Sequence, residues 1–179
     1  MIVLRNLCKT YRLYGQSRTV ANNINAVFPS NVSVALLGRN GAGKSTLLRM
    51  ISGASDPTSG EILSTGSISF PIGFAGSFNN DMTGAQNTRF VARAYGADTE
   101  SMKDYVEEFA ELGQHFYLPL RAYSSGMKSR LSFGVSMALQ FDTYLVDEVT
   151  GVGDAQFKKK SGAVFKDRMK NAGAIFCSH

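Results

Sequence analysis

The sequence predicts an α/β fold in which helices flank a parallel sheet and a block of helices interrupts the chain. Short apolar runs typical of strands alternate with longer segments in which apolar residues recur at helical spacing. A glycine-rich loop joins one of these strands to the helix after it. Between about 76 and 139 only helical patterns occur, and strand patterns return near 143.

The first predicted elements lie on either side of the glycine-rich loop. Residues 32–37 form a short, mostly apolar run, which predicts a buried strand. Residues 45–52 carry leucine and isoleucine at helical spacing and predict a helix. A turn is expected over 56–60 and a strand begins at 61–63, whereas the pattern over 70–78 is irregular.

The inserted block is expected to be helical. Thr83 and Gln86 have the spacing of a capping box, which predicts the start of a helix that reaches about Tyr95. A second helix is expected over 99–112 and a third over 124–139, each with apolar residues on one face.

Strand and helix alternate again after this block. A strand is expected over 143–146, a helix over 155–170 and a last strand over 174–177. The predicted order is strand, loop, helix, helical insertion, strand, helix, strand, which is the order of a parallel sheet with helical crossovers.

Composition limits the classes of protein that this chain can belong to. Its 179 residues are 44% apolar and 18% charged, as in one globular domain, and no apolar run is long enough to span a membrane. The net charge of +5 is compatible with nucleic acid or anionic lipid. Apart from Lys158-Lys159-Lys160, however, the basic residues are scattered without interleaved aromatics, so we expect no nucleic-acid partner.

The glycine-rich loop has the pattern of a phosphate-binding loop. Residues 38–45 fit G-x-x-x-x-G-K-[ST], between a predicted strand and a predicted helix, rather than a glycine-rich turn with an incidental lysine. Backbone N–H groups and the helix start can cradle phosphates, Lys44 adds a charge, and the Ser45 hydroxyl suits Mg²⁺. The predicted nucleotide-binding residues here are Gly38, Asn40, Gly41, Ala42, Gly43, Lys44, Ser45 and Thr46.

Two further segments can act on a bound polyphosphate. Asp147 and Glu148 follow the strand predicted at 143–146, where Asp147 can hold Mg²⁺ and Glu148 can activate water as a general base. Read alone, the pair is also compatible with an acidic turn. Residues 123–127 read Tyr-Ser-Ser-Gly-Met, and Ser124, Ser125 and Gly126 open a helix whose N-terminus can bind an anion or simply be capped.

In order and spacing these motifs resemble those of the ABC ATPases. The Walker A loop at 38–45, the signature-like segment at 123–127 and the Walker B end at Asp147-Glu148 are followed by a D-loop-like stretch that reaches Asp154 and by His179. Tyr11 stands where that family places an aromatic side chain that stacks on adenine. Within the family, four stretches resemble the ATPases of capsular polysaccharide exporters, with O-antigen and teichoic acid exporters as near relatives: 70–76, 90–93, 123–127 and 152–160.

The resemblance implies one ABC ATPase domain over 1–179. Its P-loop NTPase (RecA-like) α/β core would comprise 1–75 and 140–179, with an N-terminal antiparallel β part, and the helical subdomain would span about 76–139. Because the family fold normally continues beyond His179, we expect a chain truncated at the C-terminus, which binds nucleotide better than it hydrolyses it.

The resemblance also implies a mechanism and a set of partners. ATP and Mg²⁺ would be held in a head-to-tail homodimer, between Lys44 and Ser45 of one copy and Ser124 and Gly126 of the other. Ser125 and Asp154 would also bind the nucleotide. Glu148 would act as the base, with Lys44 and His179 contacting the γ-phosphate. The dimer would power an integral membrane permease that exports capsular polysaccharide, and it would sit on the cytoplasmic face of the inner membrane.

The sequence also departs from the family pattern. No glutamine lies between Ile68 and Ala85, where the family has one that touches Mg²⁺, and Phe74 or Ala75 stands at that place. Val149 replaces the usual proline. The alternatives that stay open are another ABC exporter, for O-antigen or teichoic acid, a soluble P-loop kinase, and an ABC protein without a transport role.

Overall fold

The computed structural model describes residues 1–72, 78–147 and 155–178. These residues form two compact units. The first unit contains 1–71, 141–147 and 169–178, and the second contains the other described residues. Each unit is described by itself below.

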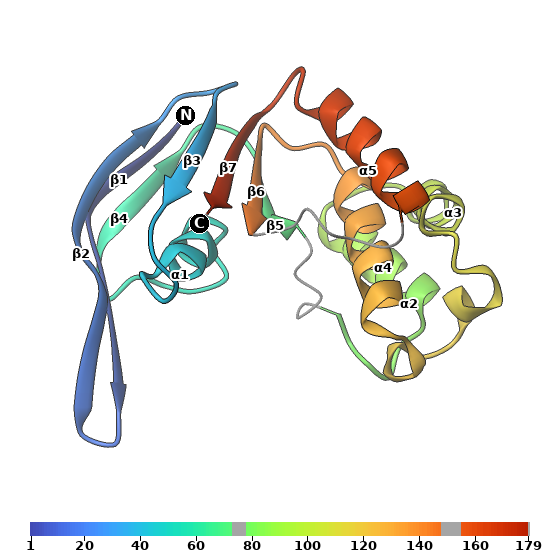
Figure 1. Cartoon of the computed structure of the whole chain (residues 1–179), viewed down its shortest axis with the longest axis horizontal. Helices are drawn as coiled ribbons and strands as arrows, with labels where there is room; N and C mark the ends of the chain where they lie inside the picture. Colours follow the sequence, from blue (N-terminus) through green and yellow to red (C-terminus); the bar gives the residue numbers. More distant parts are fainter. Residues whose placement is uncertain (73–77, 148–154, 179) are drawn as a thin grey trace. The chain divides into compact units, whose positions relative to one another are not determined.

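An antiparallel sheet makes up the N-terminal part of the first unit. Strand β1 (Ile2–Leu13) pairs on one side with β2 (Gln16–Phe28) and on the other with β4 (Ser59–Ser64). The hairpin between β1 and β2 is long (Figure 1) and turns at Tyr14 and Gly15, which both have positive φ. The antiparallel part that the resemblance implied is therefore present, as is the strand expected at 61–63.

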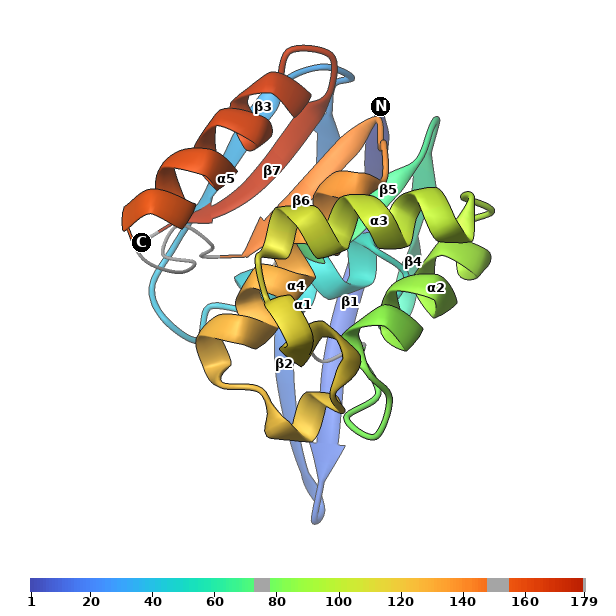
Figure 2. The ribbon, with the colours of Figure 1, turned by 90° about the vertical axis from the view of Figure 1, so that its right-hand side faces the viewer.

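A second sheet, largely parallel, holds the order β3-β7-β6-β5 (Figure 2). It consists of β3 (Ser33–Leu37), β7 (Gly173–Ser178), β6 (Thr143–Asp147) and β5 (Ile68–Ile72), and both β3 and β6 run parallel to β7. The parallel sheet expected from the sequence is confirmed.

The irregular segment predicted from residue 70 onward is wrong as far as Ile72, because β5 continues to that residue. Pro71 lies inside this strand. Proline removes a backbone donor, which argues against a central strand, but β5 is the last strand in the order and an edge strand tolerates it. Residues 73–77 lie outside the described ranges.

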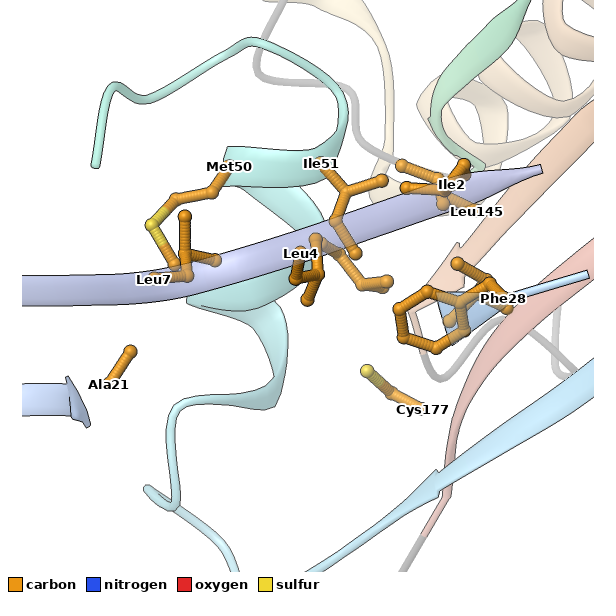
Figure 3. Packing of buried hydrophobic residues seen from close by; sticks show 11 residues of the cluster. Ile2, Leu4, Leu7, Ala21, Phe28, Met50, Ile51, Leu145 and Cys177 are labelled. Carbon is orange, nitrogen blue, oxygen red and sulfur yellow. The ribbon is translucent and has the colours of Figure 1, made fainter. Parts of the chain in front are cut away.

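Helix α1 (Lys44–Ile51) packs between the two sheets of the first unit. Figure 3 shows Met50 of this helix pointing toward Leu7 of β1. Burial of a side chain of this size contributes about 1.5 to 3 kcal/mol, so the cluster fixes the helix against both sheets. The cluster consists of Ile2, Leu4, Leu7, Ala21, Phe28, Leu48, Met50, Ile51, Leu145, Ile175 and Cys177.

The second unit is helical among its described residues (Figure 1). Its helices are α2 (Gly84–Ala94), α3 (Thr99–Ala110), α4 (Ser125–Ala138) and α5 (Ala155–Arg168), with short 3₁₀ turns between α3 and α4.

The capping box predicted at the start of α2 is confirmed. The Gln86 N–H donates to Thr83 Oγ1 at 3.1 Å, and the Thr83 N–H donates to Gln86 Oε1 at 2.9 Å. Side-chain caps of this kind satisfy donors that the first helical turn leaves without an intrahelical acceptor.

Helix α5 differs from its expected grouping, because it belongs to the helical unit rather than to the α/β core. Phe157 is buried with its ring centroid 5.5 Å from that of Phe109. Arg168 Nη2 donates to the Met137 carbonyl at 2.9 Å, and Lys160 pairs with Glu111 at 2.6 Å. One residue of the lysine run is thus bound to α3 instead of lying on a solvated face.

Asp142 joins the start of β6 to the segment before β5. Its carboxylate accepts hydrogen bonds from the Ser67 N–H at 2.7 Å and from the Ser67 hydroxyl at 2.8 Å. These bonds favour the ionised form and lower the pKa of Asp142 below its ordinary value of 3.8.

Asp142→Asn is expected to lower the melting temperature at neutral pH, because an amide cannot accept both bonds in the same way. A depressed folded pKa gives stability that is complete above the unfolded pKa and is lost as pH falls toward the folded pKa. The difference in melting temperature between wild type and variant should therefore shrink below about pH 4.

Thermal unfolding between pH 2 and pH 7 measures this difference. Asp56→Asn is the matched control, since the exposed Asp56 carboxylate has no hydrogen bond among the described residues. If the melting temperature of the wild type exceeds that of Asp142→Asn by the same amount at every pH, the stabilising role of the ionised Asp142 carboxylate is contradicted.

Candidate nucleotide site

The loop between β3 and α1 needs glycine at a defined place. Gly41 and Gly43 have φ of +77° and +96°, which side chains rarely adopt. A Cβ atom on Gly43 would also lie 2.8 Å from the Val20 carbonyl oxygen. Within the loop, the Ala42 N–H donates to the Arg39 carbonyl at 3.1 Å. The glycines therefore permit a curl that turns backbone N–H groups inward.

The N-terminus of α1 opens into a cavity. Gly43 is the N-cap residue and supplies no side-chain cap, and the Leu47 N–H makes the first helical bond to the Gly43 carbonyl at 2.9 Å. The N–H groups of residues 44–46 therefore have no intrahelical acceptor and carry the positive end of the helix dipole. All three residues line a cavity of about 470 Å³. This is an arrangement that binds phosphate.

Lys44 and Ser45, the two side chains predicted to contact the phosphates and Mg²⁺, lie at this helix start. Lys44 Nζ donates to the carbonyls of Gly38 at 2.5 Å and Arg39 at 3.2 Å, which keeps the ammonium group over the loop. Ser45 Oγ donates to Asp147 Oδ1 at 3.1 Å, although 102 positions separate the two residues. Asp147 ends β6, and parallel strands bring their carboxyl ends to one edge of a sheet.

Ser45 and Asp147 together fit a magnesium ion. A hydroxyl and a carboxylate are the hard oxygen ligands that Mg²⁺ prefers, and its sites in nucleotide enzymes use one or two carboxylates together with phosphate oxygens. Among the described residues no group of three or more His, Cys, Asp or Glu side chains could hold a metal ion. Ser45 and Asp147 supply two oxygen ligands, and phosphate oxygens of a bound nucleotide would supply others.

The β1–β2 hairpin supplies the rest of the cavity lining. Tyr11 is 44% exposed, and Lys9 Nζ lies 5.2 Å from the centroid of its ring. Arg18 and Val20 of β2 also line the cavity, and Arg18 is the cross-strand partner of Tyr11. The structure thus brings Tyr11 together with the predicted loop residues Asn40, Gly41, Ala42, Gly43, Lys44, Ser45 and Thr46.

The signature-like segment lies in the helical unit. Ser124 is the exposed N-cap of α4, and its Oγ accepts the Met127 N–H at 3.2 Å. Tyr123 is buried beside Gly84 at the start of α2, and this burial raises the pKa of Tyr123 to about 12. The tyrosine therefore anchors the segment, while Ser124, Ser125 and Gly126 stay exposed.

Gly126 has no requirement for glycine within the described fold. It lies in the first turn of α4 without a positive φ, and the nearest neighbour of a Cβ atom there would be Ser124 Oγ at 3.9 Å. Glycine in a helix costs about 1 kcal/mol relative to alanine. Nothing among the described residues of this unit therefore explains the glycine at this position.

Comparison with known proteins decides the family. The sequence profile of the family described as "ABC transporter" matches residues 21–151. The chain belongs to the ABC transporter family. It is accordingly an ATP-binding cassette, which is a class of ATPase.

Among curated relatives, this cassette resembles the ATP-binding proteins of capsule exporters. It is 52% identical to the polysialic acid transport ATP-binding protein KpsT of Escherichia coli, over all of this chain and 81% of the relative. It is 45% identical to the capsule polysaccharide export ATP-binding protein CtrD of Neisseria meningitidis serogroup B, over all of this chain and 83% of the relative. An O-antigen export ATP-binding protein, RfbE of Yersinia enterocolitica, is 37% identical over 90% of this chain and 69% of the relative.

Solved structures confirm the cassette fold. The dimeric ATP-binding cassette MJ0796, bound to ADP and Pi, superposes with a TM-score of 0.80 at 20% identity, over all of this chain and 88% of the other. At this identity the likeness concerns the fold alone. The family and the fold class predicted from the sequence are both confirmed.

Some predicted site residues of this cassette lie outside the described ranges. These are Glu148, Asp154 and His179, together with Phe74, Ala75 and Val149. Their assigned roles stay predictions.

Arg18 and Val20 are not among the site residues predicted from the sequence. The register of the hairpin would have revealed them, because a turn at Tyr14-Gly15 places Arg18 opposite Tyr11. Gly38 does not line the cavity itself, and it contributes the carbonyl that holds Lys44.

Proposed function

We propose that this cassette binds and hydrolyses ATP with Mg²⁺ and so powers the export of capsular polysaccharide through a separate membrane permease. The observation that carries the proposal is the uncapped start of α1, which opens with Lys44 into a cavity bordered by Tyr11. A flat aromatic ring at one side and a cationic helix start at the other match a nucleobase and its polyphosphate.

Different residues of the cavity would bind different parts of the nucleotide. The backbone N–H groups of the loop and Lys44 neutralise the β- and γ-phosphates, and Tyr11 orients the adenine by stacking. Ser45 and Asp147 would hold Mg²⁺, which neutralises charge on the phosphate oxygens when it is bound. Glu148 is the proposed base that polarises the attacking water.

A second copy of the cassette would complete the site. Ser124 and Gly126 present an exposed helix start with room for an anion, and Gly126 has no structural need to be glycine. A head-to-tail homodimer would place this helix start of one copy against the γ-phosphate held by Lys44 of the other. Closure around ATP then excludes water and converts binding energy into motion. The dimeric state of MJ0796 supports this arrangement.

The transported substrate is proposed from the relatives. KpsT, CtrD and BexA are named for polysialic acid transport, for capsule polysaccharide export and for ATP binding, respectively, and share 44% to 52% identity with this chain. The O-antigen exporters, at 33% to 38%, support the alternative cargo less well. No helix among the described residues is long and apolar enough to cross a membrane. The proposed permease would hold the cassette at the cytoplasmic face of the inner membrane.

Product analysis tests the chemistry against the kinase alternative. With Mg²⁺ and ATP alone, the purified cassette is expected to release ADP and free phosphate in equal amounts. A phosphorylated acceptor without free phosphate would favour a kinase instead.

In vesicles that contain the cassette with its permease, labelled capsular polysaccharide should cross the membrane with ATP and not with a non-hydrolysable analogue.

A further inference from the structure

We propose that Arg18 is a further nucleotide-binding residue of this cassette, and that its guanidinium group binds the phosphate chain. The inference deepens the proposed function and rests on it. None of the site motifs contains Arg18, because it comes from β2 rather than from the phosphate loop.

The position of Arg18 follows from the register of the hairpin. Arg18 is directly paired with Tyr11 across β1 and β2, so the two side chains leave the same face of the sheet. Both line the cavity into which α1 opens. Arg18 Nη2 lies 4.0 Å from the point that a Cβ atom on Gly41 would occupy, so the guanidinium reaches the phosphate loop itself.

The charges in the cavity favour an anion beside Arg18. Among the residues that the structure describes, the lining includes Arg18 and Lys44 and contains no aspartate or glutamate. Among the described residues, no carboxylate pairs with Arg18. A planar guanidinium can make two parallel hydrogen bonds to phosphate oxygens, and such bonds are shorter and stronger than neutral ones.

Two other uses of the side chain are physically reasonable. Arg18 can stack on the nucleobase beside Tyr11, or it can be an exposed hairpin residue without a ligand. The nearness of Arg18 to Gly41 favours the phosphates, because residue 41 belongs to the loop that would wrap them and the hairpin already offers Tyr11 to the base.

The experiment compares three probes on four proteins by titration calorimetry. The probes are ATP with Mg²⁺, inorganic tripolyphosphate, and adenosine. The proteins are the wild type, Arg18→Ala, Arg18→Lys and Arg12→Ala. Arg12 is the matched control, since it is an exposed arginine of the same hairpin, paired with Ser17, and does not line the cavity.

Arg18→Ala is expected to weaken the binding of ATP and of tripolyphosphate by about tenfold or more, and to leave adenosine unchanged. Arg18→Lys should recover part of the loss, because it restores the charge without the fork of donors. Arg12→Ala should bind all three probes as the wild type does.

Three results would overturn the inference. If Arg18→Ala binds tripolyphosphate as tightly as Arg12→Ala does, Arg18 takes no part in phosphate binding. A loss confined to adenosine and ATP assigns Arg18 to the base. A wild type that binds neither ATP nor tripolyphosphate removes the proposed function together with this inference, whereas in the first two results the wild type still binds ATP.

Discussion

Lys44→Ala is expected to weaken ATP binding by about 30- to 150-fold. The Lys44 ammonium group lies over the phosphate loop, held by the carbonyls of Gly38 and Arg39. A hydrogen bond to a charged group contributes about 1.5 to 3 kcal/mol, and an ammonium group that reaches both the β- and γ-phosphates favours the upper part of that range. Since 1.4 kcal/mol corresponds to a factor of ten in affinity, a loss of about 2 to 3 kcal/mol weakens ATP binding by about 30- to 150-fold. Equilibrium titration with Mg²⁺ and ATP measures it.

The control for this variant removes the same charge elsewhere. Lys159→Ala changes an exposed lysine of α5 and should leave the affinity for ATP unchanged. Thermal unfolding of both variants checks that the first unit stays folded. An affinity of Lys44→Ala within threefold of the wild type would remove the lysine from the phosphate site.

Sequence patterns were informative where one local interaction decides the structure. The capping box at Thr83 and Gln86 is set by two side chains within one turn, and it formed as predicted. The Ser45–Asp147 pair could be anticipated for a different reason. Asp147 ends β6, Ser45 lies at the start of the helix after β3, and both strands run parallel to β7. Residues that are far apart in the sequence lie close together when they are at or just beyond the carboxyl ends of parallel strands in one sheet.

The β1–β2 hairpin could not be derived from the residue pattern alone. Its register shifts between Leu4 and Leu7 and again near Lys9, and each shift interrupts the alternation of inward and outward residues. Its turn places Tyr14 at positive φ, where asparagine or glycine is usual. The position of Arg18 opposite Tyr11 is set by this turn alone, because no register shift separates the pair from Tyr14. The resemblance correctly implied an antiparallel sheet.

The unit to which α5 belongs also cannot be predicted from the local sequence pattern. Helical spacing of apolar residues predicts that a helix exists but does not say which neighbour covers its apolar face. Here the contacts of Phe157 with Phe109 and of Arg168 with the Met137 carbonyl place α5 in the helical unit.

Gly126→Asp separates the stability of the cassette from its activity. Residue 126 lies in the first turn of α4, where a Cβ atom has room and φ is not positive. A carboxylate near a helix N-terminus contributes about 0.3 to 1 kcal/mol, and replacing a helical glycine adds a few tenths more. The variant is therefore expected to unfold at the same temperature as the wild type or a few degrees higher.

The same substitution is expected to lower the rate of ATP hydrolysis by more than about 100-fold. In the proposed dimer the α4 start of one copy faces the γ-phosphate held by the other, and a carboxylate there replaces an attractive helix start by a like charge. Loss of one stabilising donor at a developing negative charge costs about 10²- to 10³-fold, and repulsion adds to that cost. Binding of ATP by the single copy, through Lys44 and Tyr11, should change little.

Gly162→Asp distinguishes this effect from a general effect of charge. Gly162 is an exposed glycine inside α5 with no atom within 4 Å of a Cβ position, so the same substitution fits there without strain. It should keep the wild-type rate of hydrolysis. If Gly126→Asp also hydrolysed ATP at the wild-type rate while remaining folded, no phosphate would approach the start of α4, because a carboxylate and a γ-phosphate cannot share one helix N-terminus without a large loss of rate. The second half of the proposed site would then have to lie elsewhere on the cassette.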